Sequence, residues 1–484
     1  MFPFIRNQQT LIRRGGCSSV SRVSSSLTRP ISITTQRRSL VSEATAPSIP
    51  QPTQERGPIE SVDEYWRTLP PWKHITHVDF MSWAWAIKNM VEGKEKLHEF
   101  LDAVLPDEVP RRKGLEGMQS RDGFMGDVAG GMKASAMSVK VTPYVLSRVN
   151  WKDPANDPIF NQFIPLRSVM LPDHPQLEFD SLHEAADSPV DGVVHRYPDK
   201  ALFLPISVCP TYCIFCTRSY GVGRDTELLT KQGFKLSRPR LEAAFAYIES
   251  QEGLKDIVVS GGDAYYLPPH ILNWIGDRLI NMKNVERFRI ASKGLAVGPT
   301  RILDKQDPWA DALINVSDKA RRAGKQMALH THFNHPNEIS WITEKASLKL
   351  MQSGVTVRNQ TVLTRGINDN VETMFTLIQK LSKMGIQPYY VYQGDMVPKV
   401  EHLRTPLQTI IDLDSQIQGL TAGYNTPKFV VDLPGGGGKR QAAHFESYDR
   451  RTGVSTFTAP GLTRNGKGGK VYRYYDPVDP VKSA

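Results

Sequence analysis

Three cysteines lie close together in the sequence and could share one inorganic centre. Cys209, Cys213 and Cys216 are separated by three and then two residues. Three thiolates cannot close a four-coordinate structural zinc site, but they can hold three irons of a 4Fe–4S cluster and leave the fourth iron open. An open iron can bind S-adenosylmethionine, and an electron from the cluster can then cleave it to a carbon radical. The spacing therefore predicts a radical-forming centre; a zinc site completed by a histidine, or three unreactive thiols, is the alternative.

The segment around these cysteines, CPTYCIFCTR, is similar to the cysteine motif of the radical S-adenosylmethionine superfamily. Phe215 stands before the last cysteine, where that superfamily favours an aromatic residue. Downstream, Ser260, Gly261, Gly262 and Asp263 follow the apolar run DIVVS, and glycines at a strand end let the backbone approach a ligand closely. In the superfamily such a stretch contacts the amino group of S-adenosylmethionine; taken alone, it could also be a simple turn.

A run of four glycines leads to a lysine after another apolar run. Residues 430–440 read VVDLPGGGGKR, with the lysine at Lys439. A phosphate-binding loop is excluded, because Leu433 stands where its first glycine should be and Arg440 replaces the Ser or Thr that would bind magnesium. A lysine amine can form a Schiff base with pyridoxal phosphate. From these residues alone, a mobile loop with a solvated lysine is an equally good interpretation.

The chain resembles the lysine 2,3-aminomutase family, whose members are pyridoxal-phosphate-dependent radical enzymes. The resemblance runs from about residue 72 to 460, through HRYPDK, CPTYCIFCTR, SGGDA, HTHFNHPNE, RNQTVL, YYVYQGD, EHLRTP and VDLPGGGGK. It implies an α/β fold, an incomplete parallel (β/α) barrel with a helical N-terminal region and a site inside the barrel mouth. It also implies an isomerase that converts L-lysine to β-lysine by 1,2-migration of the amino group bound to pyridoxal phosphate.

The resemblance also implies roles for individual residues. The family's pyridoxal-phosphate lysine falls on Lys439, and a tyrosine beside the cofactors falls on Tyr392. The contacts of the pyridoxal phosphate group fall on Arg196, Tyr197 and Lys200; the family often has arginine at the position of Lys200. The contacts of S-adenosylmethionine fall on His332 and Gln360. An electron donor of unidentified kind must reduce the cluster.

Lysine as substrate needs a cation for its carboxylate and anions for its ε-ammonium. Arg218 matches the family's carboxylate clamp, and a guanidinium fork suits a bidentate carboxylate. Asp395 and Asp432 match the family's two ammonium contacts, and a buried ammonium needs paired anions. Related glutamate aminomutases depart at these positions, so both aspartates favour lysine. Read without the family, Asp395 and Asp432 are a turn residue and a strand-end cap.

Two departures from the family concern assembly. Bacterial members often carry a structural zinc at a subunit interface, but Asn370 stands where the first ligand would be and the C-terminal segment has no cysteine. We therefore expect this zinc site to be absent. A homo-oligomer could still form, but it would lack the zinc contact between subunits that the family uses. Residues 221–236 are an insertion.

Three other functions fit part of the sequence. His330, His332 and His335 could bind zinc as in metal-dependent hydrolases, but this leaves the cysteines and the glycine–lysine segment unexplained. A degenerate homologue could bind the iron–sulfur cluster without turnover. The same chemistry could also act on another amino acid or on a protein-bound lysine.

The elements that must position these residues can be read from hydrophobic periodicity. Short apolar runs at 201–208, 256–260, 288–291, 326–329, 355–357, 388–392 and 429–431 alternate with amphipathic stretches such as 240–249, 346–352 and 370–384. This alternation predicts a parallel α/β architecture, with functional residues just after the strands. Before it, 64–105 looks helical with Asp79 as a candidate N-cap, and the glycine-rich 122–132 looks like a loop.

The ends of the chain have a different composition. Residues 1–42 contain seven Arg, no Lys and no acid, so without them the net charge falls from +10 to +3. Arg-rich, Ser-rich and acid-free composition predicts a mitochondrial transit peptide and a matrix location, with an RNA-binding basic arm as the alternative. No stretch is apolar enough to predict a membrane span, and we expect neither a nucleic-acid nor a membrane partner. The expected organisation is a transit peptide (1–42), a linker (43–60), a helical region (61–190), a radical core (191–425), a lysine strand and loop (426–460) and an irregular tail (461–484).

Overall fold

The computed structural model describes residues 63–462 and 466–478, so the expected transit peptide and linker lie outside the described residues. All seven apolar runs form strands, as expected from short β-branched and aromatic segments bounded by polar residues. Most strands extend beyond the predicted run, but β6 ends at Ile206, two residues before the end of its run, and β10 begins at Thr356, one residue after the start of its run. The seven strands are β6 (Lys200–Ile206), β7 (Asp256–Gly261), β8 (Arg287–Ala291), β9 (Gln326–Thr331), β10 (Thr356–Val362), β11 (Gln387–Tyr392) and β12 (Lys428–Leu433).

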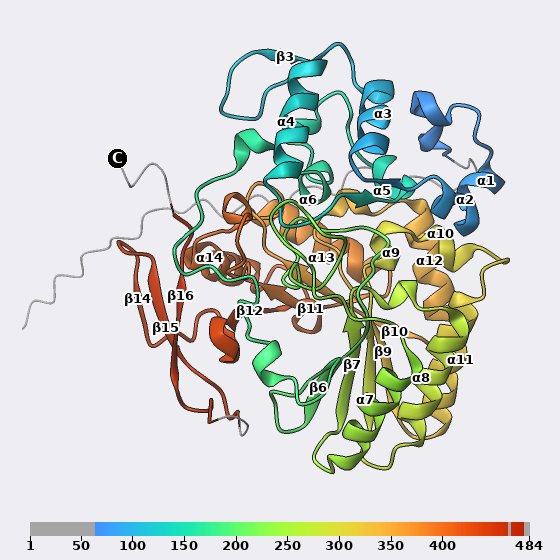
Figure 1. Ribbon diagram of the computed structural model, residues 1–484, viewed down its shortest axis with the longest axis vertical. Helices are drawn as coiled ribbons and strands as arrows, with labels where there is room; N and C mark the ends of the chain where they lie inside the picture. The colour runs from blue at the N-terminus through green and yellow to red at the C-terminus, as the bar shows by residue number, and fades with distance from the viewer. Residues whose placement is uncertain (1–62, 463–465, 479–484) are drawn as a thin grey trace, which may run out of the picture. The chain divides into compact units, whose positions relative to one another are not determined.

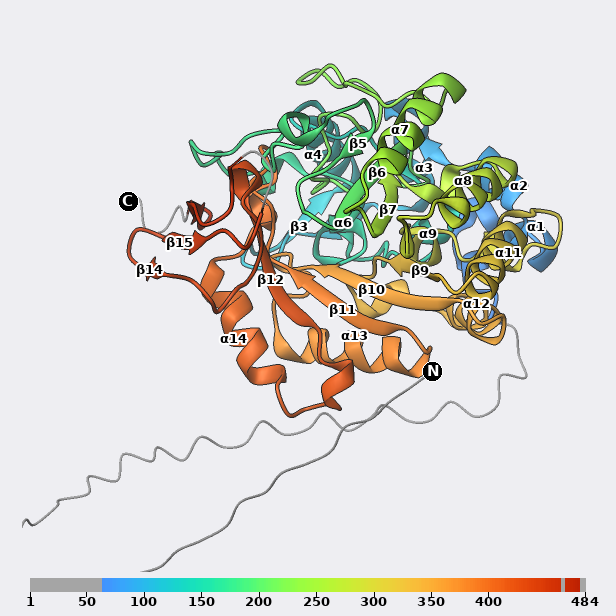
Figure 2. The same cartoon turned by 90° about the horizontal axis from the view of Figure 1, so that it is seen from below.

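These strands form one sheet in the order in which they occur along the chain. All neighbours from β6 to β12 pair in parallel, and the edges are antiparallel: β5 (Val193–Val194) on β6, and β13 (Gly438–Gln441) on β12. Within the described residues no pairing joins β13 to β5. The sheet curves but stays open, and Figure 2 shows β10, β11 and β12 turning away from β6 and β7. The prediction of an incomplete parallel barrel is confirmed.

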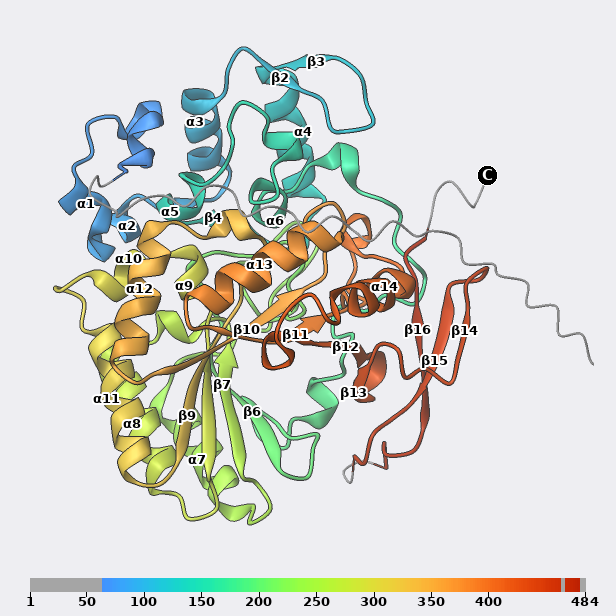
Figure 3. The same ribbon diagram turned by 180° about the vertical axis from the view of Figure 1, so that it is seen from behind.

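Helices connect consecutive strands and cover the outer face of the sheet (Figure 3). In α13 (Val371–Lys383) the buried residues Met374, Leu377, Ile378 and Leu381 recur at the spacing of one helix face. Asn370, which stands at the family's zinc-ligand position, caps this helix by accepting a hydrogen bond from the Thr373 amide at 2.9 Å. The helices that follow the strands are α7 (Arg238–Ser250), α8 (Pro269–Asn281), α9 (Gly294–Val297), α10 (Thr300–Leu303), α11 (Trp309–Arg322), α12 (Trp341–Gln352), α13 (Val371–Lys383) and α14 (Leu407–Ile417).

The N-terminal helical region lies over the end of the sheet toward which the parallel strands point (Figure 1). The Ile214 amide donates to the Gln162 carbonyl at 3.0 Å, and the Asn334 side chain donates to that of Gln162 at 3.0 Å. Gln162 therefore ties the loops after β6 and β9 to this region. Its elements are α1 (His77–Met81), α2 (Trp83–Lys88), β1 (Val91–Glu92), α3 (Lys94–Val104), β2 (Glu108–Pro110), β3 (Met118–Ser120), α4 (Arg121–Lys133), β4 (Lys140–Val141), α5 (Pro143–Leu146) and α6 (Phe160–Phe163).

Two local expectations in this region were wrong. The glycine-rich stretch predicted as a loop is helix α4, which begins at the N-cap Ser120 and buries Phe124 and Val128 on one face. Packing of this apolar face outweighs the low helix propensity of glycine. Asp79 is not an N-cap; Thr76 caps α1, and Asp79 lies three residues into it, completing a capping box.

The C-terminal segment is more ordered than the sequence suggested. Strands β14 (Ser447–Asp449), β15 (Val454–Thr458) and β16 (Val471–Tyr475) form an antiparallel sheet, so residues expected to be an irregular tail supply β16. Phe457 and Tyr474 are buried in the same apolar cluster as Val431 and Leu433 of β12. This packing explains why a segment with little periodicity adopts a fixed structure. In the part of the chain that the structure describes, no helix has the length and apolar character to cross a membrane.

Helix α4 offers a paired test of its glycines. A Cβ on Gly131 would lie 2.6 Å from the carbonyl carbon of Pro165, whereas nothing lies within 4 Å of a Cβ on Gly126. We expect Gly131→Ala to lower the free energy of unfolding by about 1–3 kcal/mol through overpacking. Gly126→Ala should raise it by about 0.5–1 kcal/mol, because alanine is the better helix former. Denaturant unfolding of both variants checks this, and a stabilised Gly131→Ala would contradict the packing.

Candidate active site

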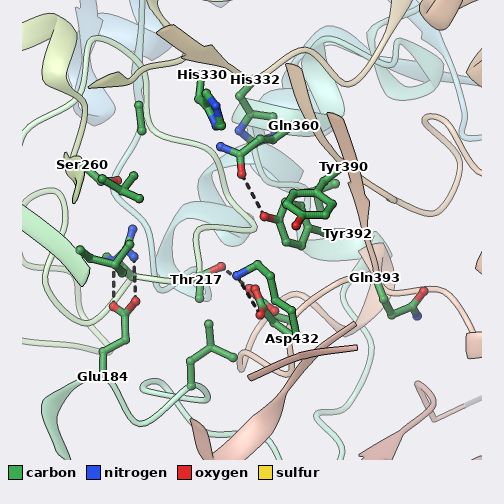
Figure 4. Close-up of a pocket in the computed structure, with 18 of the residues that line it drawn as sticks. Glu184, Thr217, Ser260, His330, His332, Gln360, Tyr390, Tyr392, Gln393 and Asp432 are labelled. Carbon is green, nitrogen blue, oxygen red and sulfur yellow. Dashed lines mark hydrogen bonds and ion pairs between the residues drawn. The ribbon is translucent and has the colours of Figure 1, made fainter. Parts of the chain in front are cut away.

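A cavity of about 410 Å³ opens inside the curved sheet. Strands β6 to β13 all contribute lining residues, because parallel strands deliver their inward-facing side chains to one enclosed space. Figure 4 shows Glu184 and Asp432 apart from each other across this space, with His332 and Gln360 at a third side. The predicted site residues that line the cavity are Arg196, Tyr197, Lys200, Arg218, Ser260, His332, Gln360, Tyr392, Asp395, Asp432 and Lys439.

The remaining predicted residues belong to two neighbouring loops. The three cysteines follow β6, and none of their thiols forms a disulfide. Burial raises the pKa of Cys209 and Cys216, and that of Cys213 to about 12. In the described residues no three His, Cys, Asp or Glu side chains are arranged to hold a single metal ion.

The donor chemistry of this loop fits an iron–sulfur cluster. Thiolates around one zinc ion must lie about 4 Å apart, whereas a four-iron cluster is ligated by a more widely spaced set. Burial keeps these thiols protonated, and a bound metal would replace the thiol protons. Electrostatic interaction among Cys209, Cys213 and Cys216 shows that the three sulfurs share one neighbourhood.

The Gly–Gly–Asp stretch packs against the strand that precedes the cysteines. Gly261 has a φ of +100°, and a Cβ on Gly262 would lie 2.6 Å from the backbone nitrogen of Val208. Asp263 is buried and accepts hydrogen bonds from the amides of Tyr265 and Lys293, each at 2.8 Å. Ser260 lines the cavity, but Gly261, Gly262 and Asp263 are not among the described lining residues. Here the glycines are required by close backbone packing.

Lys439 lies on a strand, not in a mobile loop. Antiparallel pairing sets Lys439 opposite Asp432, with Nζ 3.0 Å from Oδ1. The Lys439 amide donates to the Tyr197 hydroxyl at 2.9 Å, and Nζ lies 5.4 Å from the centre of the Tyr392 ring. Burial alone would lower the pKa of Lys439, but Asp432, Tyr392 and Tyr197 raise it well above its ordinary value. The lysine is therefore held as an ammonium by its ion pair with Asp432.

A second aspartate lies beside this pair. The Thr217 hydroxyl donates to Asp395. Burial and the neighbouring Asp432 raise the pKa of Asp395 to about 7. Two close carboxylates repel each other, so a cation placed between them would be strongly attracted.

Arg218 already holds a carboxylate in this structure. Its Nε and Nη2 each donate to Glu184 at 2.7 Å, and the Tyr220 hydroxyl donates to the same carboxylate at 2.8 Å. This bidentate pair fixes the orientation of the Arg218 guanidinium. Glu184 was not predicted as a site residue. It is an isolated acid in SLHEAADSP, and nothing in the local sequence indicates that it pairs with Arg218.

The opposite wall carries neutral polar groups. The Tyr392 hydroxyl donates to the Gln360 side chain at 3.0 Å, and His332 Nε2 lies 3.0 Å from the Asn334 side-chain oxygen. Burial and Lys293 lower the pKa of His332 well below its ordinary value, so its ring is neutral. His335 instead accepts a hydrogen bond from the Asn337 amide and caps the short 3-10 turn that follows it. His332 and His335 therefore have separate partners, and among the described residues the three histidines proposed as an alternative zinc set are not arranged to hold one metal ion.

The positive wall is formed by Arg196 and Lys200. Arg196 Nε donates to Asp187 at 2.6 Å, and Lys200 Nζ lies 4.0 Å from the centre of the Tyr197 ring. An aromatic face and two cations beside a cavity suit a phosphate group attached to a small ring. Asp187 was a second acid that the sequence analysis missed.

The raised pKa of Asp395 gives a stability test. The folded protein holds this proton more tightly than the unfolded chain does, so the stabilisation is complete below about pH 4 and is lost as the pH rises through about 7. Between about pH 5 and pH 8 we expect the natural protein to lose about 2–3 kcal/mol more unfolding free energy than Asp395→Asn. Denaturant titrations at both pH values check this; equal losses in the two proteins would contradict it.

Comparison with known proteins gives the family. No family model matches the chain. L-lysine 2,3-aminomutase of Clostridium subterminale is 36% identical over 367 residues, which cover 76% of this chain and 79% of the relative. The Bacillus subtilis L-lysine 2,3-aminomutase is 32% identical over 377 residues, 78% of this chain and 71% of the relative. Glutamate 2,3-aminomutase of Clostridioides difficile is 30% identical over 304 residues, 62% of this chain and 66% of the relative.

A structural comparison adds little to these relatives. The crystal structure of Streptococcus suis SuiB bound to precursor peptide SuiA superposes with a TM-score of 0.33 at 12% identity, over 49% of each chain, which is too low to bear on the fold. The identities and shared lengths of the aminomutases are sufficient by themselves. The chain belongs to the lysine 2,3-aminomutase family and is an aminomutase, a class of isomerase.

Proposed function

We propose that the protein converts free L-lysine to β-lysine. The observation that carries the proposal is that one cavity contains a guanidinium fork, Arg218, and two carboxylates, Asp395 and Asp432. Lysine presents the complementary charges, a carboxylate at one end and an ammonium at the other. Arg218 would bind the substrate carboxylate in place of Glu184, because the intact Arg218–Glu184 pair is neutral.

The two aspartates favour lysine over glutamate. A glutamate side chain would bring a third negative charge next to Asp395 and Asp432, and like charges in a buried site destabilise binding. An ε-ammonium would instead stabilise the ionised form of Asp395. The relative named for glutamate shows that both substrates occur among similar proteins, so the charge of this cavity is the deciding feature.

The same cavity and its adjoining loops would hold three cofactors. Cys209, Cys213 and Cys216 would ligate a 4Fe–4S cluster, and Ser260, Gly261, Gly262, Asp263, His332 and Gln360 would lie around S-adenosylmethionine. Pyridoxal phosphate would attach to Lys439, with its phosphate near Arg196, Tyr197 and Lys200. When bound, these groups supply a carbon radical and an aromatic ring that stabilises a neighbouring radical.

The protein's own residues prepare this chemistry. Asp432 holds the Lys439 ammonium in place through their ion pair, and the amine must lose a proton before it can react as a nucleophile. The neutral His332 ring and the Tyr392–Gln360 hydrogen bond form a wall without free charge. The N-terminal region, tied through Gln162 to the loops after β6 and β9, covers the end of the sheet toward which the strands point.

A turnover assay tests the proposal. Anaerobically reconstituted protein with a reductant, S-adenosylmethionine and pyridoxal phosphate should convert L-lysine, but not L-glutamate, to its β-isomer. Lys439→Ala should keep its iron and lose turnover, because the cluster and the lysine occupy different loops. Product chromatography and iron analysis provide the measurements.

The possible results separate the alternatives. A full cluster without conversion of free lysine would refute the proposal and favour either a cluster-binding homologue without activity or another substrate, such as a protein-bound lysine. Turnover retained in Lys439→Ala would refute the role of that residue.

We also propose that residues 1–42 direct the protein to the mitochondrial matrix. Their seven arginines and absence of acids support this, whereas the bacterial relatives named above give it no support. A fluorescent reporter fused to residues 1–45 should accumulate in mitochondria of a eukaryotic cell. A variant with the arginines changed to glutamine serves as the control, and diffuse cytosolic signal from the unchanged fusion would reject the proposal.

A further inference from the structure

The C-terminal segment packs directly on the four glycines before Lys439. A Cβ on Gly437 would lie 2.6 Å from Cγ of Tyr472, and one on Gly438 would lie 3.2 Å from Cγ of Pro460. A Cβ on Gly436 would collide with Nζ of Lys467. Gly436 also has a φ of +81°, which favours glycine. The absence of side chains at these glycines therefore leaves room for the C-terminal segment to pack against them. The glycines are explained by this packing and not by a need for a mobile loop.

Lys467 enters a buried charge cluster through this contact. Its Nζ lies 2.7 Å from both carboxylate oxygens of Asp187. The Asp187 side chain is 0% exposed, and it also accepts from Arg196 Nε at 2.6 Å. Lys467 and Arg196 are themselves 12% and 9% exposed. One carboxylate thus joins two cations from distant parts of the chain.

The balance of these three charges matters for Arg196. An Arg196–Asp187 pair alone is neutral and would attract an anion weakly. With Lys467 the three groups carry one net positive charge, and Arg196 is the member that lines the cavity. Lys467 is not among the described residues lining it. Its ammonium can therefore influence a ligand in the cavity without touching it, through its contact with Asp187 and so with Arg196.

We propose that Lys467 is a positioning residue that frees the charge of Arg196 for a phosphate monoester in the cavity. By sharing Asp187, Lys467 keeps that carboxylate from neutralising the guanidinium. The inference rests on the proposed binding of pyridoxal phosphate, and it assigns the C-terminal segment a part in recognising the phosphate group.

The test compares two probes that differ only in the phosphate. Full-length protein is titrated with pyridoxal phosphate and with pyridoxal, and binding to Lys439 is followed by absorbance. We expect Lys467→Met to weaken pyridoxal phosphate binding about tenfold and to leave pyridoxal binding unchanged. Lys467→Arg should bind both probes as the natural protein does. Lys470→Met, an exposed lysine of the same segment, is the matched control and should change neither.

A double variant tests the charge balance itself. Adding Asp187→Asn to Lys467→Met also removes the carboxylate that pairs directly with Arg196. We expect this change to restore most of the lost phosphate affinity. If the double variant binds pyridoxal phosphate no better than Lys467→Met does, the charge-sharing account is wrong.

The outcomes separate this inference from the proposed function. Equal weakening of both probes in Lys467→Met would show a purely structural role and overturn the inference, as would unchanged binding of pyridoxal phosphate. If the natural protein fails to bind pyridoxal phosphate through Lys439, the proposed function itself fails and the inference falls with it.

Discussion

Asp432 and Lys439 face each other across antiparallel strands β12 and β13, with an ammonium nitrogen 3.0 Å from a carboxylate oxygen. A buried charge is tolerated only when it is paired, and this pair sits at the edge of the cavity. The backbone register fixes the position of the amine, so the site does not depend on a flexible lysine. Burial and the nearby Asp432 raise the pKa of Asp395, so an additional cation in the cavity would favour its ionised form.

The same rule organises the rest of the cavity. A short segment before β5 supplies two acids to two arginines: Glu184 pairs with Arg218, and Asp187 pairs with Arg196. Each acid orients its guanidinium before any ligand arrives, which lowers the ordering cost of binding. Cations and anions therefore occupy defined parts of one cavity, and a zwitterionic amino acid with a charged side chain is the kind of molecule that fits them.

The local elements followed from the sequence to a large extent. Seven apolar runs predicted seven parallel strands, and a helical period predicted α13. Both predictions succeeded because a buried strand or a buried helix face requires apolar residues at a characteristic spacing in the sequence. Helix α4 was predicted as a loop because its glycines were given more weight than its apolar residues. Two of these, Phe124 and Val128, are buried on one face of the helix. Strand β16 was missed because its stability comes from pairing with β15 and from the burial of Tyr474, which no local pattern reports.

By itself, the sequence determined which residues could do chemistry: the three closely spaced cysteines, the lysine after four glycines, and the family motifs that point to Arg218, Asp395 and Asp432. Tertiary structure alone decided how their charges are balanced. Glu184 lies 34 residues from Arg218, and Lys467 lies 280 residues from Asp187. Such pairs are chosen by three-dimensional proximity and burial, where an unpaired charge is costly, and not by spacing along the chain.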